Sequence, residues 1–501
     1  MTKKIQLSLF VSLSLLFLYG CAPYEYTGKR EMRGVWIATV ANIDWPASRN
    51  QTTEQKINDL KQELDKLKDA GINAVFFQVR TECDALYESD YEPWSYWLTG
   101  KQGEAPSPYF DPLKIVIEEA HKRGMELHAW LNPYRAVKKV GDYPASPDHI
   151  AVTFPSWILT FNDYKMLDPG LPAVRNYIKL VVGDIVRKYD VDGIHFDDYF
   201  YPYSPKVSSE DSLTYALYNN GINNVDDWRR YNINTMIAQV NDTIKQVKPW
   251  IKFGVSPFGI VENKYAGTSG FNSYSILYCD PLTWIKDKTV DYIVPQLYWE
   301  MEHEKAPYSK LLPWWASVSG DVHLYVGLYS SRLASPRYEK EKDEIDRQIK
   351  LNRETANVSG HIFFSSKSIT SNAFKDFSVR LKNELHSHPA LPPVMAWQNF
   401  VVPAAPLKMN AVYSGGKVKL TWEQTDKKDV SGYIIYRFSA DEEINLNNSS
   451  KIVGVIPGAD SAEYTEDLKG ATGEFNYIIS AYNRLYQESK KGLSLKIKIS
   501  G

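Results

Sequence analysis

The segment "GIHFDDYFYPY", residues 193–203, is a short apolar run that leads to two adjacent carboxylates, Asp197 and Asp198, among five phenylalanine and tyrosine side chains. Such a pair could ligate a metal ion, perform acid–base chemistry or cap a turn. Its place in the fold distinguishes these roles, because catalytic side chains of α/β barrels gather where the strands end. The pattern of the surrounding chain therefore has to be established first.

A unit of apolar strand, polar loop and amphipathic helix recurs from residue 32 onward. Helix signals are clear over residues 53–70, which carry apolar side chains at helical spacing, and after the Asp-Pro pairs that begin at Asp111 and Asp280. The apolar runs predict eight strands, at residues 33–39, 73–79, 126–130, 193–196, 252–257, 292–298, 323–329 and 361–365. Eight strands alternating with helices over about 350 residues predict an α/β fold, a (β/α)8 TIM barrel with its longest insertions after strands 2, 3 and 4.

The composition changes after the last barrel helix. We predict the barrel over residues 31–388, a Pro-rich linker or strap over 389–406, and a small all-β immunoglobulin-like sandwich over 407–501. This last segment resembles a fibronectin type III domain, which would be a spacer, a glycan-binding module or a structural addition. A sandwich of this kind would bury Trp422, Tyr433, Tyr436 and Tyr477.

The first residues have the features of a targeting segment. Lys3 and Lys4 precede an apolar run too short to span a membrane, and the "LYGC" ending resembles a bacterial lipobox. We therefore predict a signal peptide over residues 1–20, a lipid on Cys21 and a tether over 21–30. The expected location is the bacterial cell envelope, as a membrane-anchored lipoprotein. An ordinary signal peptide with an incidental cysteine is the alternative.

Bulk composition excludes some classes of function. The chain has 501 residues, a formal net charge of −2 and a pI near 6.5, so no basic surface favours nucleic acid as a partner. Aromatic residues make up 13%, which suits sugar-stacking platforms but also a large core. Beyond Cys21 only Cys83 and Cys279 remain, so a disulfide framework is excluded and at most one bridge could form.

Side-chain alternation along the strands selects candidate site residues. On strand 4, Ile194 and Phe196 suit the layer between strands and helices, which leaves His195 and Asp197 facing the barrel axis. Asp198 has the opposite parity and is expected to orient its neighbour. The same reasoning places a second group toward the barrel interior: Gln78, Arg80, His128, Trp130, Asn132, Gln296, Tyr298, Glu300, Tyr325 and Tyr329.

Glycoside hydrolysis is the chemistry that uses such a set, because it needs two carboxyl groups beside the scissile bond. We predict Asp197 and Glu300 as the catalytic pair, with Asp198 in support, and expect no metal and no cofactor. Aromatic rings would stack on the sugars, while Arg80 and Asp84 would bind hydroxyl or carboxyl groups. The predicted substrate-binding residues are Trp36, Gln78, Arg80, Asp84, Trp94, His128, Trp130, Asn132, His195, Gln296, Tyr298 and Tyr329.

Seven ordered motifs over about residues 30–395 resemble one family: "RGVWIATVANIDWP", "FFQVRTECDALYESDYEPWS", "HAWLNPYR", "DGIHFDDYFYP", "WRRYNIN", "FGVSPFGI" and "VPQLYWE". It is the glycosyl-hydrolase-like TIM-barrel family of bacterial envelope lipoproteins, which includes glycosidases acting on denuded peptidoglycan. The resemblance implies hydrolysis of O-glycosyl bonds in a cell-wall glycan or related polysaccharide. "DGIHFDD" is also similar to the strand-4 motif of retaining α-glycosidases, which implies Asp197 as nucleophile and Glu300 as acid/base.

Two other classes of function remain open. The "HFDD" sequence resembles the "TFDD" motif of polysaccharide deacetylases, but those enzymes add an H-x-x-x-H pair, and none of the nine histidines has that spacing. A non-catalytic glycan-binding lipoprotein would hold a strand without cutting it. The sequence leaves open the sugar, the linkage, endo or exo cleavage, and retention or inversion.

Overall fold

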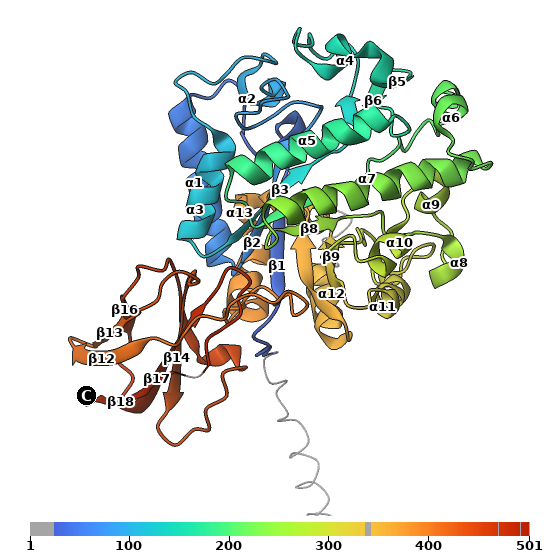
Figure 1. The fold of residues 1–501 in the computed structure, drawn as a ribbon. Helices are drawn as coiled ribbons and strands as arrows, with labels where there is room; N and C mark the ends of the chain where they lie inside the picture. The colour runs from blue at the N-terminus through green and yellow to red at the C-terminus, as the bar shows by residue number, and fades with distance from the viewer. Residues whose placement is uncertain (1–24, 336–341, 469, 491, 500–501) are drawn as a thin grey trace, which may run out of the picture.

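The chain folds into an α/β barrel followed by a β-sandwich, which confirms the predicted fold class (Figure 1). The computed structural model describes residues 25–335, 342–468, 470–490 and 492–499. The predicted signal peptide and Cys21 lie outside the described residues. In the described part of the chain, no helix has both the length and the apolar composition needed to cross a bilayer.

Eight parallel strands form the closed barrel. β1 pairs with β2 on one side and with β11 on the other, and this second pairing closes the barrel. All eight predicted strands are present, and seven keep most of the predicted length. The strands are β1 (Met32–Ile37), β2 (Ala74–Arg80), β3 (Glu126–Leu131), β7 (Gly193–Phe196), β8 (Lys252–Val255), β9 (Tyr292–Ile293), β10 (His323–Leu328) and β11 (Val358–Phe363).

Helices surround the barrel and begin where the local sequence predicts. Thr52 and Gln55 form a capping box at the start of α1, and Asp111 and Asp280 accept backbone N–H groups at the starts of α3 and α10. The longer helices are α1 (Thr53–Asp69), α3 (Pro112–Lys122), α5 (Pro172–Lys188), α7 (Val225–Val247), α10 (Pro281–Lys286), α11 (Tyr308–Val318), α12 (Glu344–Glu354) and α14 (Lys375–Arg380).

Strand alternation separates two layers of the core. Ile194 and Phe196 of β7 pack in the layer between strands and helices, as predicted. His195 points into the barrel interior, where its ring lies 5.0 Å from that of Phe76 and 5.9 Å from that of Tyr292. The parity assigned to the strand before Asp197 is therefore confirmed.

The sixth strand of the barrel is shorter than predicted. β9 ends at Ile293, whereas the apolar pattern predicts a strand over residues 292–298. Pro295 has no N–H to donate to a ladder, and Gln296 makes only isolated bridges, to Phe258 and Gly327. The assumption that Glu300 shares a strand face with Gln296 is therefore wrong.

Insertions after β2, β3 and β7 build the end of the barrel opposite the sandwich, at the top of Figure 1. The insertion after β3 contains a three-stranded sheet that the sequence did not predict, with strand order β4-β6-β5. The elements of these insertions are α2 (Tyr96–Thr99), β4 (Arg135–Val137), α4 (Ile150–Thr153), β5 (Ile158–Phe161), β6 (Tyr164–Leu167) and α6 (Ser212–Tyr218).

The C-terminal unit is a sandwich of two antiparallel sheets. One sheet has the order β12-β13-β16 and the other β15-β14-β17-β18. The four aromatic residues predicted for its core are buried, with the rings of Trp422 and Tyr433 5.0 Å apart. The strands are β12 (Leu407–Ser414), β13 (Lys417–Glu423), β14 (Gly432–Ser439), β15 (Ile452–Pro457), β16 (Glu463–Asp467), β17 (Gly473–Tyr482) and β18 (Ser494–Ile499).

The segment before β1 ties the sandwich to the barrel. Lys29 and Arg30 both pair with Glu488 of the sandwich, at 2.5 and 2.8 Å, and Tyr436 also donates to this carboxylate. Arg30 further donates to the backbone carbonyls of Pro392 and Tyr486. These contacts join segments more than 350 residues apart in sequence, so the sandwich is fixed to the barrel through the N-terminal stem.

Replacing Glu488 with Ala should destabilise the protein by about 3 kcal/mol, because it leaves two largely buried cations without their shared partner. The measurement is the melting temperature in calorimetry. Glu474→Ala is the matched control, because Glu474 pairs with Lys496 at an exposed position of the same sandwich and should hardly change the melting temperature. Equal melting temperatures of the two variants would contradict the proposed importance of the stem.

Candidate active site

Asp197 and Asp198 directly follow β7, at the carboxyl end of the barrel strands. Both side chains are buried, with 4% and 1% of their surface exposed. Because β3 lies next to β7 in the barrel, residues at the end of β3 reach the same place. The two carboxyl groups are therefore set in the protein at the end where barrel active sites form.

Asp197 is held by two donors from β3 and the residue that follows it. The indole Nε1 of Trp130 and the amide Nδ2 of Asn132 both donate to its Oδ2, at 3.1 and 3.3 Å. Burial raises the pKa of Asp197 to about 6, against the opposing effect of the nearby Arg135 guanidinium. The two hydrogen bonds therefore fix the orientation of the carboxylate. Its pKa lies close to neutral pH.

Asp198 lies in a different environment from its neighbour. The hydroxyl of Tyr203 donates to its Oδ2, and Gln296 also hydrogen-bonds to it. Burial, together with the charge of Asp197, raises the pKa of Asp198 to about 7. With pKa values near 6 and near 7, Asp197 is mostly ionised at neutral pH while Asp198 is partly protonated, which is the condition for a base beside an acid.

A chain of hydrogen bonds inside the barrel supports this end of β7. The indole N–H of Trp36 lies 3.1 Å from Nε2 of His195, and an indole can only donate, so this nitrogen accepts. The proton of His195 is then on Nδ1, which faces the hydroxyl of Tyr292 at 3.3 Å. Burial and the nearby His128 hold the pKa of His195 well below its usual value. His195 is therefore a neutral part of the core.

Six residues predicted to bind substrate are enclosed. Their exposed fractions are 2% or less, and several of their polar groups are engaged within the protein. Gln78 accepts from the backbone N–H groups of Thr39 and Val40, and Arg80 pairs with Glu92 at 2.7 Å. They hold the loops and the interior together in this structure, and their role in binding substrate stays a prediction: Trp36, Gln78, Arg80, Asp84, His128 and His195.

The other predicted residues lie closer to the two carboxyl groups or to the surface. Trp130 and Asn132 act on Asp197, as described above, and Gln296 acts on Asp198. The ring of Tyr298 lies 5.3 Å from that of Tyr329, which is 37% exposed. Burial and the charge of Asp198 raise the pKa of Tyr298 well above its usual value. Trp94 is partly buried in the insertion after β2, where its ring lies 6.2 Å from that of Tyr109.

Glu300 lies in the loop that follows β9. Its backbone carbonyl accepts the N–H groups of His303 and Tyr308, and its side chain lines a cavity of about 570 Å³ together with Glu344 and Arg347. Neither Asp197 nor Asp198 lines this cavity. Its role as the second catalytic carboxyl group remains a prediction, without the strand geometry that suggested it.

Two residues near the carboxyl groups were missed in the candidate set. Arg135 is 6% exposed and its guanidinium lies 5.1 Å from the centre of the Tyr199 ring, and Tyr203 donates to Asp198. Arg135 ends the motif "HAWLNPYR" and Tyr203 ends the segment "GIHFDDYFYPY", both quoted above, and both residues lie beyond the ends of the barrel strands. Strand alternation therefore could not assign them a direction.

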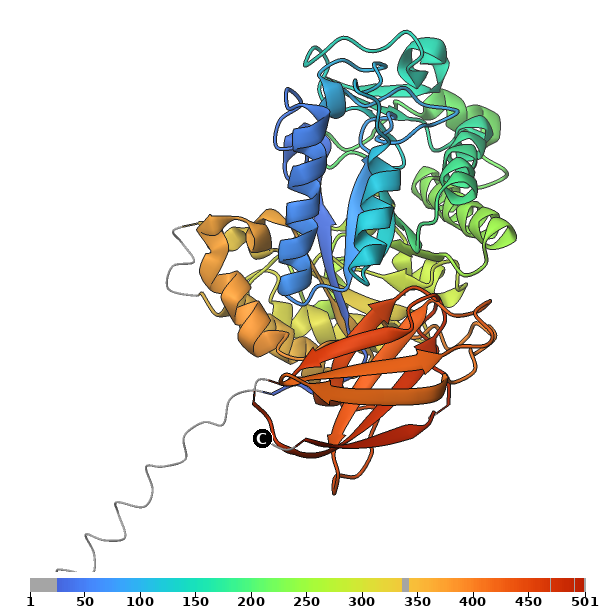
Figure 2. The ribbon, with the colours of Figure 1, turned by 90° about the vertical axis from the view of Figure 1, so that its left-hand side faces the viewer.

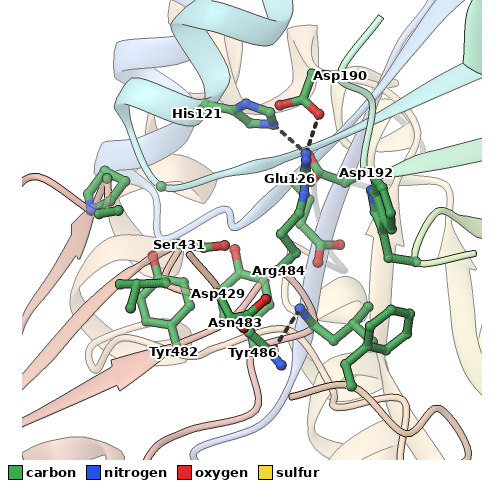
Figure 3. Close-up of a pocket in the computed structure, with 18 of the residues that line it drawn as sticks. His121, Glu126, Asp190, Asp192, Asp429, Ser431, Tyr482, Asn483, Arg484 and Tyr486 are labelled. Atoms are coloured by element: carbon green, nitrogen blue, oxygen red, sulfur yellow. Dashed lines mark hydrogen bonds and ion pairs between the residues drawn. The ribbon is translucent and has the colours of Figure 1, made fainter. Parts of the chain in front are cut away.

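Cys83 and Cys279 are separate, buried free thiols, so the single bridge that the sequence left open does not form. Among the residues that the structure describes, no three His, Cys, Asp or Glu side chains are grouped as a metal site would require. A cavity of about 1090 Å³ lies at the other end of the barrel, between its amino-terminal face and the sandwich (Figure 3).

A closed (β/α)8 barrel with buried carboxyl groups at the carboxyl end of its fourth strand defines a TIM-barrel protein with a candidate acid–base site. Residues 31–345 match the model of the glycosyl hydrolase-like 10 family, and the chain belongs to this family. This confirms the family that the sequence motifs indicated.

Named relatives cover much of the chain. Glycosyl hydrolase YngK of Bacillus subtilis (strain 168) is 35% identical over 483 residues, which are 92% of each chain. Glycosyl hydrolase DigH of Escherichia coli (strain K12) is 38% identical over 369 residues, 66% of this chain and 82% of that protein. Among solved structures, the glycoside hydrolase domain of PgaB (BpsB) from Bordetella bronchiseptica has a TM-score of 0.46 and 12% identity, covering 71% of this chain and 99% of that one.

Proposed function

We propose that the protein is a glycosidase that hydrolyses O-glycosyl bonds in a bacterial cell-wall glycan or related polysaccharide. The observation that carries the proposal is the pair of buried carboxyl groups after β7, whose pKa values burial raises to about 6 and about 7. At neutral pH such a pair supplies one mostly ionised and one partly protonated group.

In this mechanism Asp197 is the nucleophile or base. Trp130 and Asn132 donate to Oδ2, whereas Oδ1 accepts only the backbone N–H of Tyr199 at 3.4 Å, so Oδ1 is the oxygen that we assign to the reacting carbon or to a water molecule. Asp198 keeps its proton up to about pH 7. The local contacts therefore favour Asp198 as the group that donates a proton to the leaving oxygen. Glu300, the donor that the sequence pattern predicted, is the alternative.

We also propose that the protein is a lipoprotein of the cell envelope, anchored through Cys21. The supporting feature is the order of lysines, apolar run and "LYGC" at the N-terminus. A lipid at that position would bring the enzyme to a membrane next to its glycan substrate.

Purified protein should release soluble oligosaccharides from peptidoglycan glycan strands stripped of their peptides, with products identified by mass spectrometry. A parallel digest of an unrelated plant polysaccharide, such as xylan, tests the substrate class. Binding of the glycan strands without any product would support the glycan-binding alternative. Release of acetate without chain cleavage would instead support a deacetylase.

A further inference from the structure

The N-terminal stem, residues 25–31, is bound along one face of the molecule. It leads into β1, so it lies at the amino-terminal face of the barrel, and all eight barrel strands run away from it. Figures 1 and 2 both show the chain entering at this end, beside the sandwich. Asp197 follows the carboxyl end of β7 and is therefore at the opposite end of the barrel.

The stem is anchored along its length by contacts with both units. Glu25 approaches His388, the residue just before the strap, at 3.1 Å, and the carbonyl of Thr27 accepts the N–H of Ser449 in the sandwich. Lys29 and Arg30 share Glu488, as described above. The stem therefore does not act as a free tether, and its direction of exit is set by the fold.

The distance from the stem to the predicted anchor is short. Four residue steps separate Cys21 from Glu25, and an extended chain spans at most about 14 Å over four steps. A lipid on Cys21 would then hold the amino-terminal face within that distance of the bilayer. β1 has six residues and is about 20 Å long, so with the tilt of about 36° that barrel strands have it rises about 16 Å along the barrel axis. The carboxyl-end face is thus at least that much farther from the membrane.

Exposed apolar side chains lie on the strap that crosses the amino-terminal face. Trp397, Val401 and Val402 are 42%, 66% and 48% exposed. Trp397 is placed at this face by its indole N–H, which donates to Asp291 just before β9, and Val401 lines the cavity between barrel and sandwich. Tryptophan and aliphatic side chains next to a lipid anchor suit contact with the headgroup region of a bilayer.

The sandwich cannot turn independently of this face. Arg484 from the sandwich pairs with Asp190 of the loop before β7 at 2.6 Å, across the cavity in Figure 3. Its guanidinium also lies 5.8 Å from the centre of the Trp250 ring on the barrel side. Together with the stem contacts, this ion pair fixes the sandwich and the amino-terminal face as one surface.

We propose that this surface, formed by the strap, the stem and the sandwich, faces a phospholipid membrane, and that the face carrying Asp197 and Asp198 is turned away from it toward the glycan. The proposal rests on the proposed anchor at Cys21. It places the sandwich on the membrane side of the enzyme, where the sandwich would keep the amino-terminal face of the barrel toward the bilayer.

The test uses the full-length lipidated protein in vesicles of phosphatidylethanolamine and phosphatidylglycerol that contain spin-labelled headgroups. A fluorophore is attached to one introduced cysteine, either Val401→Cys or Leu213→Cys, and the buried Cys83 and Cys279 remain unlabelled. Leu213 is the matched position, because it is 72% exposed and lies in α6 at the opposite end of the barrel. We expect severalfold stronger quenching at position 401 than at position 213.

Equal quenching at the two positions, or stronger quenching at 213, would overturn the orientation. Flotation of the vesicles separates this result from failure of the anchor. If the native protein does not float with vesicles, or if Cys21→Ala floats equally well, the proposed lipid anchor at Cys21 is wrong. The proposed orientation, which depends on that anchor, is then wrong too. Glycan turnover, measured on the same preparations, reports on the proposed enzyme activity independently.

Discussion

Replacing Asp197 with Asn should lower glycan turnover by about 10³-fold or more, while the protein stays folded and still binds glycan. The amide has nearly the same shape as the carboxylate, but it can neither attack carbon nor take a proton from water. The measurement is the rate of release of new reducing ends. Asp163→Asn is a suitable control, because Asp163 is an exposed aspartate in the turn between β5 and β6 and should leave turnover near the native value.

The same variant should be at least as stable as the native protein at pH 7. Burial raises the pKa of Asp197 to about 6, so the folded protein binds this proton more tightly than the unfolded chain does. The contribution of Asp197 to stability is therefore full below about pH 4 and is lost as the pH rises to about 6. The asparagine removes this loss, which amounts to about 3 kcal/mol for two pKa units. A marked fall in melting temperature at pH 7, together with lost activity, would instead indicate a structural role for Asp197.

Much of the barrel could be predicted from the sequence because its signals are local. Thr52 with Gln55, Asp111 and Asp280 mark helix starts by capping chemistry that involves only neighbouring residues. Apolar runs mark strands, and alternation correctly turned His195 inward and Phe196 outward.

The errors arose where a distant contact or a break in the strand decides the outcome. Pro295 interrupts the hydrogen-bond ladder of β9, which ends at Ile293. Alternation along a strand therefore does not apply to the residues from Gln296 to Glu300. Nothing local in the sequence shows the ion pair between Arg80 and Glu92. The attachment of Glu488 to Lys29 and Arg30 joins the two ends of the chain, and no periodicity in the sequence reports it.

The choice between Asp198 and Glu300 as the proton donor should appear in the pH dependence of kcat/KM. With Asp197 and Asp198 as the pair, activity rises as one group ionises near pH 6 and falls as the other loses its proton near pH 7, with both values belonging to the coupled pair. The Asp198→Asn variant should lose the fall on the alkaline side, because the group that titrates there is gone. Glu300→Gln should keep both limbs, because both groups that titrate in this assignment, Asp197 and Asp198, are unchanged.

The leaving group of the substrate separates a proton donor from a residue that only orients its neighbour. The 4-nitrophenolate of an aryl glycoside is a good leaving group without protonation, so loss of the proton donor changes the rate of its cleavage little. The leaving oxygen of a natural glycosidic bond needs the proton. Asp198→Asn should therefore cleave glycan strands about 10²-fold or more slowly than the native protein, yet cleave the aryl glycoside at a rate within about tenfold of native. Equal losses on both substrates would make Asp198 a positioning residue for Asp197. A loss confined to the natural glycan in Glu300→Gln would show that Glu300 is the acid, and that the site closes around it when substrate binds.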